Sequence, residues 1–154
     1  MFILFYLDPT GALVPLERQQ SNTAFKVKYM GYGGAQSSTT YKGAKSPVRF
    51  KAGQDIQFVV RVQTVASALE TEPDGMVNLS ALKTSKDERS IIFIKTGPMG
   101  FGAKSDVKAG LPLKYNRYGE RSLKVSPAEP LEPGEYVMKT GASLGGFLFG
   151  VDPK

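Results

Sequence analysis

A short acidic segment, "LETEPDG", holds the carboxylates that are best spaced to do chemistry. Glu70, Glu72 and Asp74 follow one another at alternate positions there. Two neighbouring carboxylates can divide the roles of general acid and general base, as in glycoside hydrolysis, and an oxygen-rich loop suits Ca²⁺. The segment therefore supports two hypotheses, a carboxylate-dependent hydrolase and a calcium site. Proline and glycine within it indicate instead a solvated loop with ordinary carboxylates, so we expect no catalytic residue, metal or cofactor.

Composition removes most other catalytic chemistry. The chain has no cysteine, histidine or tryptophan among its 154 residues. Without cysteine there is no thiolate nucleophile, disulfide framework or cysteine-based zinc site. Without histidine the commonest general base and the commonest transition-metal ligand are both missing. We therefore expect a protein that binds or assembles and is not an enzyme.

The whole chain has a net charge of +6, and its positive charge is concentrated in the first third. No acidic residue occurs from Arg18 to Gln54. The basic and aromatic residues of this region that could form one surface are Lys26, Lys28, Tyr29, Tyr32, Tyr41, Lys42, Lys45, Arg49 and Lys51. Such a surface could bind a polyanion, such as nucleic acid, lipopolysaccharide or an anionic glycan, through lysine charges and stacked tyrosines.

The alternative interpretation of these lysines is structural, because charged side chains also keep exposed edge strands from pairing. Within the same region, "GYGGAQSSTTYKGAKS" is rich in hydroxyls and glycine and indicates a flexible loop. A second basic stretch, residues 108–124, contains Lys114, Arg117 and Arg121. The sequence leaves open whether the two stretches form one patch.

The elements that must position these residues are short strands separated by turn residues, with no helical periodicity. We expect one all-β domain over residues 1–154. The predicted strands are Phe2–Leu7, Leu13–Leu16, Phe25–Tyr29, Thr39–Tyr41, Val48–Phe50, Ile56–Val62, Val77–Leu82, Arg89–Lys95, Leu111–Tyr115, Ser122–Val125, Glu135–Lys139 and Gly146–Val151. Arg89–Lys95 is apolar on both faces, which predicts a central strand.

A local motif points to the type of sandwich. "LEPGEY", Leu131 to Tyr136, resembles the tyrosine corner of fibronectin-type-III and other immunoglobulin-like domains. The resemblance implies that Leu131 fills the core, that Pro133 and Gly134 form the turn, and that the Tyr136 hydroxyl bonds the backbone upstream. The predicted fold is thus an immunoglobulin-like β-sandwich with extra strands, and a jelly roll is the alternative.

A wider resemblance covers nearly the whole chain. "FYLDPTGALVPLERQ", "SPVRFKAGQDIQFVVRV" and "PLEPGEYVMKTG…FLFGVD" are similar, in that order, to a group of uncharacterised, mostly exported bacterial β-sandwich proteins. The resemblance implies a β-sandwich fold and export, and it brings no functional residues. We therefore expect a binding or assembly module whose partner is an unknown protein or an anionic macromolecule.

The amino-terminal run Met1–Leu7 is apolar but lacks a basic leader and a cleavage site, so it does not predict a signal peptide. No later run reaches the roughly 20 apolar residues of a membrane helix. We expect an exported protein, periplasmic, cell-surface or secreted, if a leader has been removed, and otherwise a cytoplasmic one.

Overall fold

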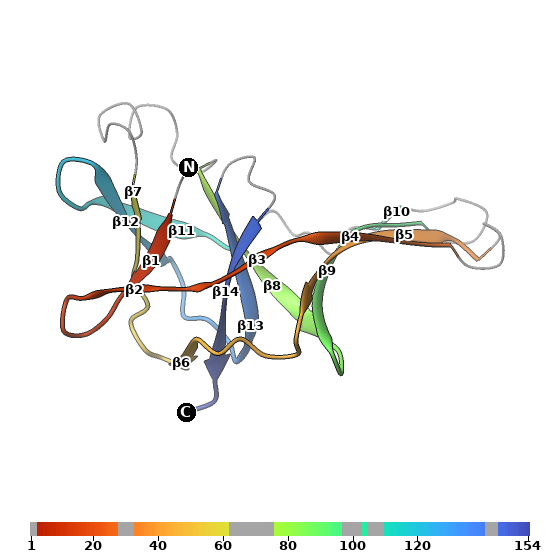
Figure 1. Ribbon diagram of the computed structural model, residues 1–154, viewed down its shortest axis with the longest axis horizontal. Coiled ribbons are helices and arrows are strands. Elements are labelled where there is room, and N and C mark those ends of the chain that lie inside the picture. The colour runs from red at the N-terminus through yellow and green to blue at the C-terminus, as the bar shows by residue number, and fades with distance from the viewer. Residues whose placement is uncertain (1–2, 28–32, 62–75, 97–102, 105–109, 141–144) are drawn as a thin grey trace.

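The fold of the chain is all-β. A computed structural model describes residues 3–27, 33–61, 76–96, 103–104, 110–140 and 145–154, and the regular structure in these residues consists of strands in two sheets. Figure 1 shows a body with a long ribbon of strands extending from one side. In the described part of the chain no helix is long and apolar enough to cross a membrane.

The smaller sheet has five strands in the order β11-β12-β7-β1-β2. Their bounds are β1 Leu4–Leu7, β2 Leu13–Pro15, β7 Phe58–Arg61, β11 Leu113–Arg117 and β12 Ser122–Pro127. The predicted opening hairpin is present, with Leu7 paired to Leu13 across the turn. Asp8 shapes this turn, because its Oδ1 accepts hydrogen bonds from the amides of Thr10 and Ala12, both at 2.9 Å.

The larger sheet has nine strands, and seven of them follow the order β3-β14-β13-β8-β9-β5-β4. Their bounds are β3 Glu17–Gln20, β4 Asn22–Val27, β5 Ala35–Lys42, β8 Val77–Thr84, β9 Glu88–Thr96, β13 Gly134–Thr140 and β14 Gly145–Asp152. The two others are β6 Arg49–Lys51, which pairs with β14, and β10 Ala103–Lys104, which pairs with β9. Strand β9 lies between β8 and β5, so its predicted central position is confirmed.

The two sheets enclose an apolar core, which makes the fold a β-sandwich. Phe58 and Val60 point inward from β7, as their alternation predicted, and meet Phe149 of β14. Phe149 packs edge-on against Phe50 with 5.6 Å between ring centroids. The predicted all-β sandwich with extra strands is confirmed. Both the immunoglobulin-like and the jelly-roll arrangement pack two such sheets, and the choice between them stays a prediction.

The predicted corner contact is present at the start of β13. The Tyr136 hydroxyl donates a hydrogen bond of 2.6 Å to the carbonyl oxygen of Glu132. Its ring stacks on Phe149 at 5.5 Å, and Leu131 packs against the same core. The corner therefore fixes the entry into β13 both by a backbone hydrogen bond and by ring packing.

The larger sheet curls until its two ends meet. Only Ser21 separates β3, which pairs with β14, from β4, which pairs with β5. The Gln19 carboxamide closes the gap beside them, because it accepts from the amide of Lys42 at 2.9 Å and donates to the same residue's carbonyl at 3.0 Å. The Gln19 side chain thus makes the two hydrogen bonds that the backbone of a neighbouring strand would make. The sheet becomes nearly a barrel with an interior of its own.

Two sequence expectations require correction here. The segment 31–46 was expected to be a flexible loop apart from the short strand Thr39–Tyr41, yet the strand extends over Ala35–Lys42 as β5 and is paired on both sides. Two of its hydroxyl-bearing residues, Ser38 and Thr39, are buried. Strand β3 was not expected at all, because "ERQQ" carries no apolar alternation.

Candidate functional site

The predicted basic surface survives only in part. Lys42, Lys45 and Lys51 are exposed on the segment that leads from β5 to β6. Lys26 lies in β4, on the ribbon that extends from the body. Lys28, Tyr29 and Tyr32 lie outside the described residues.

Tyr41 does not belong to this surface, and its prediction as a stacking residue is wrong. Its side chain is fully buried inside the curled sheet, where it packs with Leu82, Ile91 and Leu148. The space for its ring is provided by Gly146, since a Cβ at that position would lie 2.9 Å from the Tyr41 hydroxyl. Burial raises the pKa of Tyr41 to about 12.

Arg49 is also unavailable to a polyanion, because acidic side chains of the protein hold it. Its Nη2 donates to Asp152 Oδ1 at 2.6 Å, and its Nη1 pairs with Glu135 Oε1. The hydrogen bonds to Asp152 and then to Glu135 raise the pKa of Arg49, although burial acts against them. Gly150 leaves room for this contact, since a Cβ there would overlap both Arg49 and Glu135.

A buried ionic network fills the same interior at the base of β5 and β9. Arg89 is 0% exposed, and its Nη1 and Nη2 bind the two Glu17 oxygens at 3.0 and 2.9 Å. The same guanidinium donates to the carbonyl oxygens of Gly43 at 2.8 Å and Lys42 at 2.7 Å, and it lies 3.7 Å from Glu135. The hydrogen bonds of Arg89 thus join β9 to β3 and to the end of β5, and its charge lies beside Glu135 of β13.

The network anchors a projecting arm, which we define as β4, β5, the outer part of β9, and β10. Figure 1 shows the arm leaving the body as a long ribbon. A β-bulge marks its departure, where the register between β5 and β9 shifts between Ser37 and Ser38. Bulges bend a strand and increase its twist, so this one marks the point where β5 and β9 turn away from the body.

The arm carries exposed apolar side chains on its edge strand. Phe25 is 69% exposed and Val27 is 48% exposed, both in β4, which ends the strand order. The residue opposite Phe25 is Ser37, too small to cover an aromatic ring. The alternation "FKVK" in residues 25–28 predicted a strand, but no sequence signal predicted that Phe25 and Val27 would be exposed.

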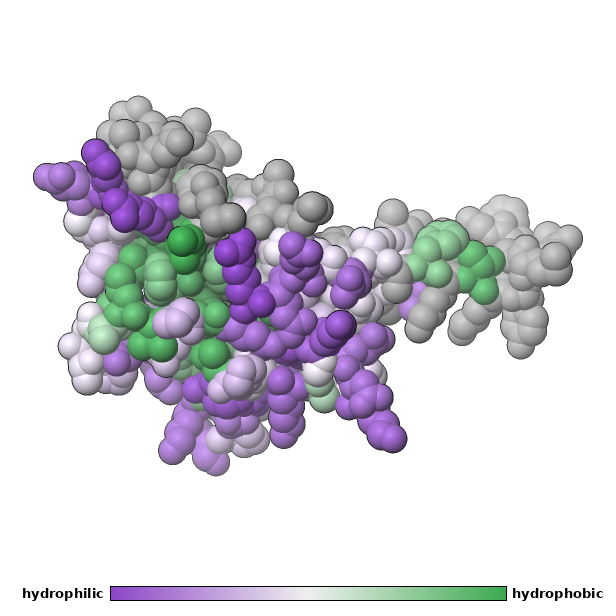
Figure 2. All heavy atoms as spheres, in the orientation of Figure 1, coloured by the Kyte–Doolittle hydropathy of each residue, from purple (hydrophilic) through white to green (hydrophobic). Residues whose placement is uncertain are grey.

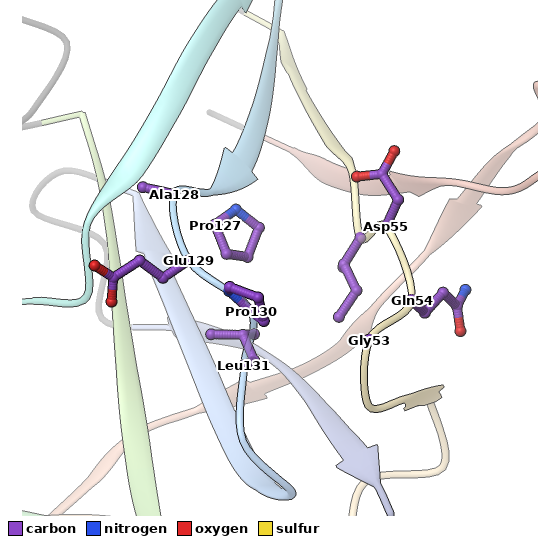
Figure 3. A pocket seen from close by; sticks show the side chains of 9 residues that line it. Gly53, Gln54, Asp55, Pro127, Ala128, Glu129, Pro130 and Leu131 are labelled. Atoms are coloured by element: carbon purple, nitrogen blue, oxygen red, sulfur yellow. The ribbon is translucent and has the colours of Figure 1, made fainter. Parts of the chain in front are cut away.

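The described residues give no structural support to the hydrolase and calcium hypotheses. Glu70, Glu72 and Asp74 lie outside the described residues. A hollow of about 230 Å³ is lined by both Asp55 and Glu129, but Figure 3 shows their carboxylates on its opposite sides, pointing away from each other. Across the described ranges, no group of three or more potential acidic metal ligands comes together.

The described residues of the second basic stretch lie away from the arm. Lys114 and Arg117 are exposed on β11 at the edge of the smaller sheet, and Arg121 is exposed in the turn that follows. In Figure 1 the β11–β12 hairpin and the arm lie on opposite sides of the body. The basic residues of this hairpin therefore do not form one patch with Lys26 of the arm.

Comparison with protein-family models, curated proteins and solved structures finds no match.

Proposed function

We propose that the protein is a non-enzymatic binding or assembly module that contacts its partner through the arm. The single observation that carries this proposal is the exposure of Phe25 and Val27 on an edge strand that projects from the body. An exposed apolar edge strand invites pairing with another chain, and proteins use such edges to bind extended segments.

The anchoring of the arm supports the same function. Arg89 and Gln19 tie the base of the arm to β3 through hydrogen bonds of 2.7 to 3.0 Å. A fixed arm loses little conformational freedom when it binds, and preorganisation of this kind increases affinity. The network thus explains how a domain of this size can hold the base of a projecting arm in place.

The polyanion alternative has weaker support. It keeps Lys42, Lys45 and Lys51 as exposed charges, but Tyr41 is buried and Arg49 is paired with acidic residues. A polyanion site would give heparin retention that falls steeply with salt and with replacement of the three lysines. The expected export stays a prediction of the sequence resemblance.

Site-specific photo-crosslinking tests the proposed function. The photoreactive residue p-benzoylphenylalanine replaces Phe25 in the protein as expressed in its own cells, and it replaces Tyr118 in a matched control. Tyr118 is an exposed aromatic residue, at 36%, in the β11–β12 turn away from the arm. We expect a discrete adduct from position 25 and none from position 118. Equal labelling at both positions, or none at position 25, would contradict the proposal.

A further inference from the structure

We propose that the partner of the arm is a second copy of this chain, which receives the arm at the opposite end of its body. This inference rests on the proposed function, because it names the occupant of the arm. The arm of one copy is the donor, and the acceptor lies at the β1–β2 turn of the next copy.

The acceptor combines an exposed apolar face with a hollow. Leu13 is 46% exposed at the β1–β2 turn, and Ile3, which is 42% exposed, precedes the other end of β1. Leu13 lies opposite Leu7 across the hairpin, and Leu7 lines a hollow of about 420 Å³ together with Asp8 and Asp55. Pockets that take drug-sized ligands have volumes of about 300 to 1,000 Å³, so the hollow has room for a phenylalanine ring.

Charge distinguishes this occupant from others. Both charged residues that line the hollow, Asp8 and Asp55, are acidic, although the chain as a whole has a net charge of +6. The arm strand that carries Phe25 and Val27, β4, contains one charged residue, Lys26, and it is basic. A basic arm that bears Phe25 and Val27 thus complements an acidic hollow beside Leu7 and Leu13.

The same charges disfavour an arm-to-arm dimer. Two β4 edges paired with each other would place two basic strands, each with Lys26, side by side. No acidic residue occurs between Arg18 and Gln54 to offset this repulsion, and like charges across paired strands are destabilising.

The two surfaces lie apart along the molecule. Figure 2 shows the hydrophobic residues of this face in two groups, one on the body over β1 and β2 and one on the arm, with hydrophilic residues between them. Because donor and acceptor are different surfaces of one chain, the contact is heterologous and builds a head-to-tail chain or a ring.

Light scattering after size exclusion of the purified protein tests this inference. We expect the wild-type mass to rise from monomer to oligomer between low micromolar and near-millimolar concentrations. Phe25→Ser removes the donor side chain and Asp55→Lys reverses the acceptor charge, and each is expected to weaken association by at least about tenfold. Both residues are exposed, so both variants should fold, which circular dichroism checks. Tyr118→Ser, outside both surfaces, is the matched control and should associate like the wild type.

Mixing the two variants is the decisive measurement. Phe25→Ser keeps a sound acceptor and Asp55→Lys keeps a sound arm, so an equimolar mixture should give a dimer and nothing larger. A wild type that stays monomeric throughout, or an Asp55→Lys variant that associates normally, would overturn the inference. If the wild type is monomeric while position 25 crosslinks to a different protein, the inference fails and the proposed function stands. No adduct and no oligomer together would reject both.

Discussion

The core between the two sheets and the interior of the curled sheet lie on opposite faces of the same strands, β13 and β14. On one face Tyr136, Met138 and Phe149 meet other apolar side chains and build the sandwich. On the other face Glu135 meets Arg49 and Arg89 beside a small apolar cluster. The first interior is stabilised by excluded water and packing, whereas the second depends on every charge having its partner.

This difference predicts which substitution does the most damage. Arg89→Met keeps most of the side-chain volume but leaves Glu17 and Glu135 without their shared cation. Breaking a buried pair in this way costs about 3 to 5 kcal/mol of unfolding free energy, which urea melts would measure. Arg61→Met, at an exposed arginine of β7, is the control and should change stability by no more than about 0.5 kcal/mol. A loss of the same small size for Arg89→Met would mean that the network is not a stabilising element.

Acid should weaken the same network from the carboxylate side. Burial acts to raise the pKa of Glu17, but the hydrogen bonds from Arg89, Ser46 and Gln19 outweigh it and hold that pKa below its ordinary value. A lowered native pKa means that the stabilisation is complete above the unfolded pKa, about 4.3, and is lost as the pH falls through the native pKa. The loss should be smaller than for Arg89→Met, because Arg89 keeps its bonds to Lys42 and Gly43.

Glu17→Gln checks this pH dependence. The variant should be less stable than the wild type at neutral pH, and the difference between them should shrink as urea melts are repeated below the ordinary pKa of glutamate. A difference that stays constant down to the lowest pH at which both proteins fold would show that the Glu17 charge does not contribute.

The sequence predicted the first interior well and the second poorly. The inward alternation of Ile56, Phe58 and Val60, and the corner at Tyr136, are local patterns that can be read along one segment. The pair of Glu17 and Arg89 joins residues that are 72 positions apart. Glu17 also lies in β3, a strand without apolar alternation. Charged residues are so often exposed that no local rule places them inside.

The arm and Tyr41 show the same limit. The alternation at Phe25 predicted a strand, but its exposure depends on which strands fail to cover it. Tyr41 was predicted to be exposed because basic and polar residues surround it in sequence, whereas Gly146, from the other end of the chain, makes the space that buries it. Both outcomes follow from tertiary packing and not from local propensity.

Tyr136→Phe sharpens the comparison from the apolar side. The variant keeps the ring that stacks on Phe149 but loses the hydrogen bond to Glu132. We expect a loss of about 1 to 2 kcal/mol of unfolding free energy in urea melts, with the fold retained. Tyr118→Phe, at an exposed tyrosine, serves as the control. If Tyr136→Phe proved as stable as the wild type, the corner bond would have no role in holding the crossover.

Tyr41→Phe is expected to have the smallest effect, and one of opposite sign. Within the described part of the chain, the Tyr41 hydroxyl is a buried polar atom without a hydrogen-bond partner. An unsatisfied buried hydroxyl costs free energy in the native state, so its removal should raise the unfolding free energy by up to about 1 kcal/mol while the ring keeps its place opposite Gly146. Urea melts of Tyr41→Phe and Tyr136→Phe then separate the effect of burying a hydroxyl from the effect of its hydrogen bond, since both residues lie in an interior. Equal losses at both positions would mean that the Tyr41 hydroxyl is bonded, and that the curled sheet satisfies its polar groups as fully as the sandwich core does.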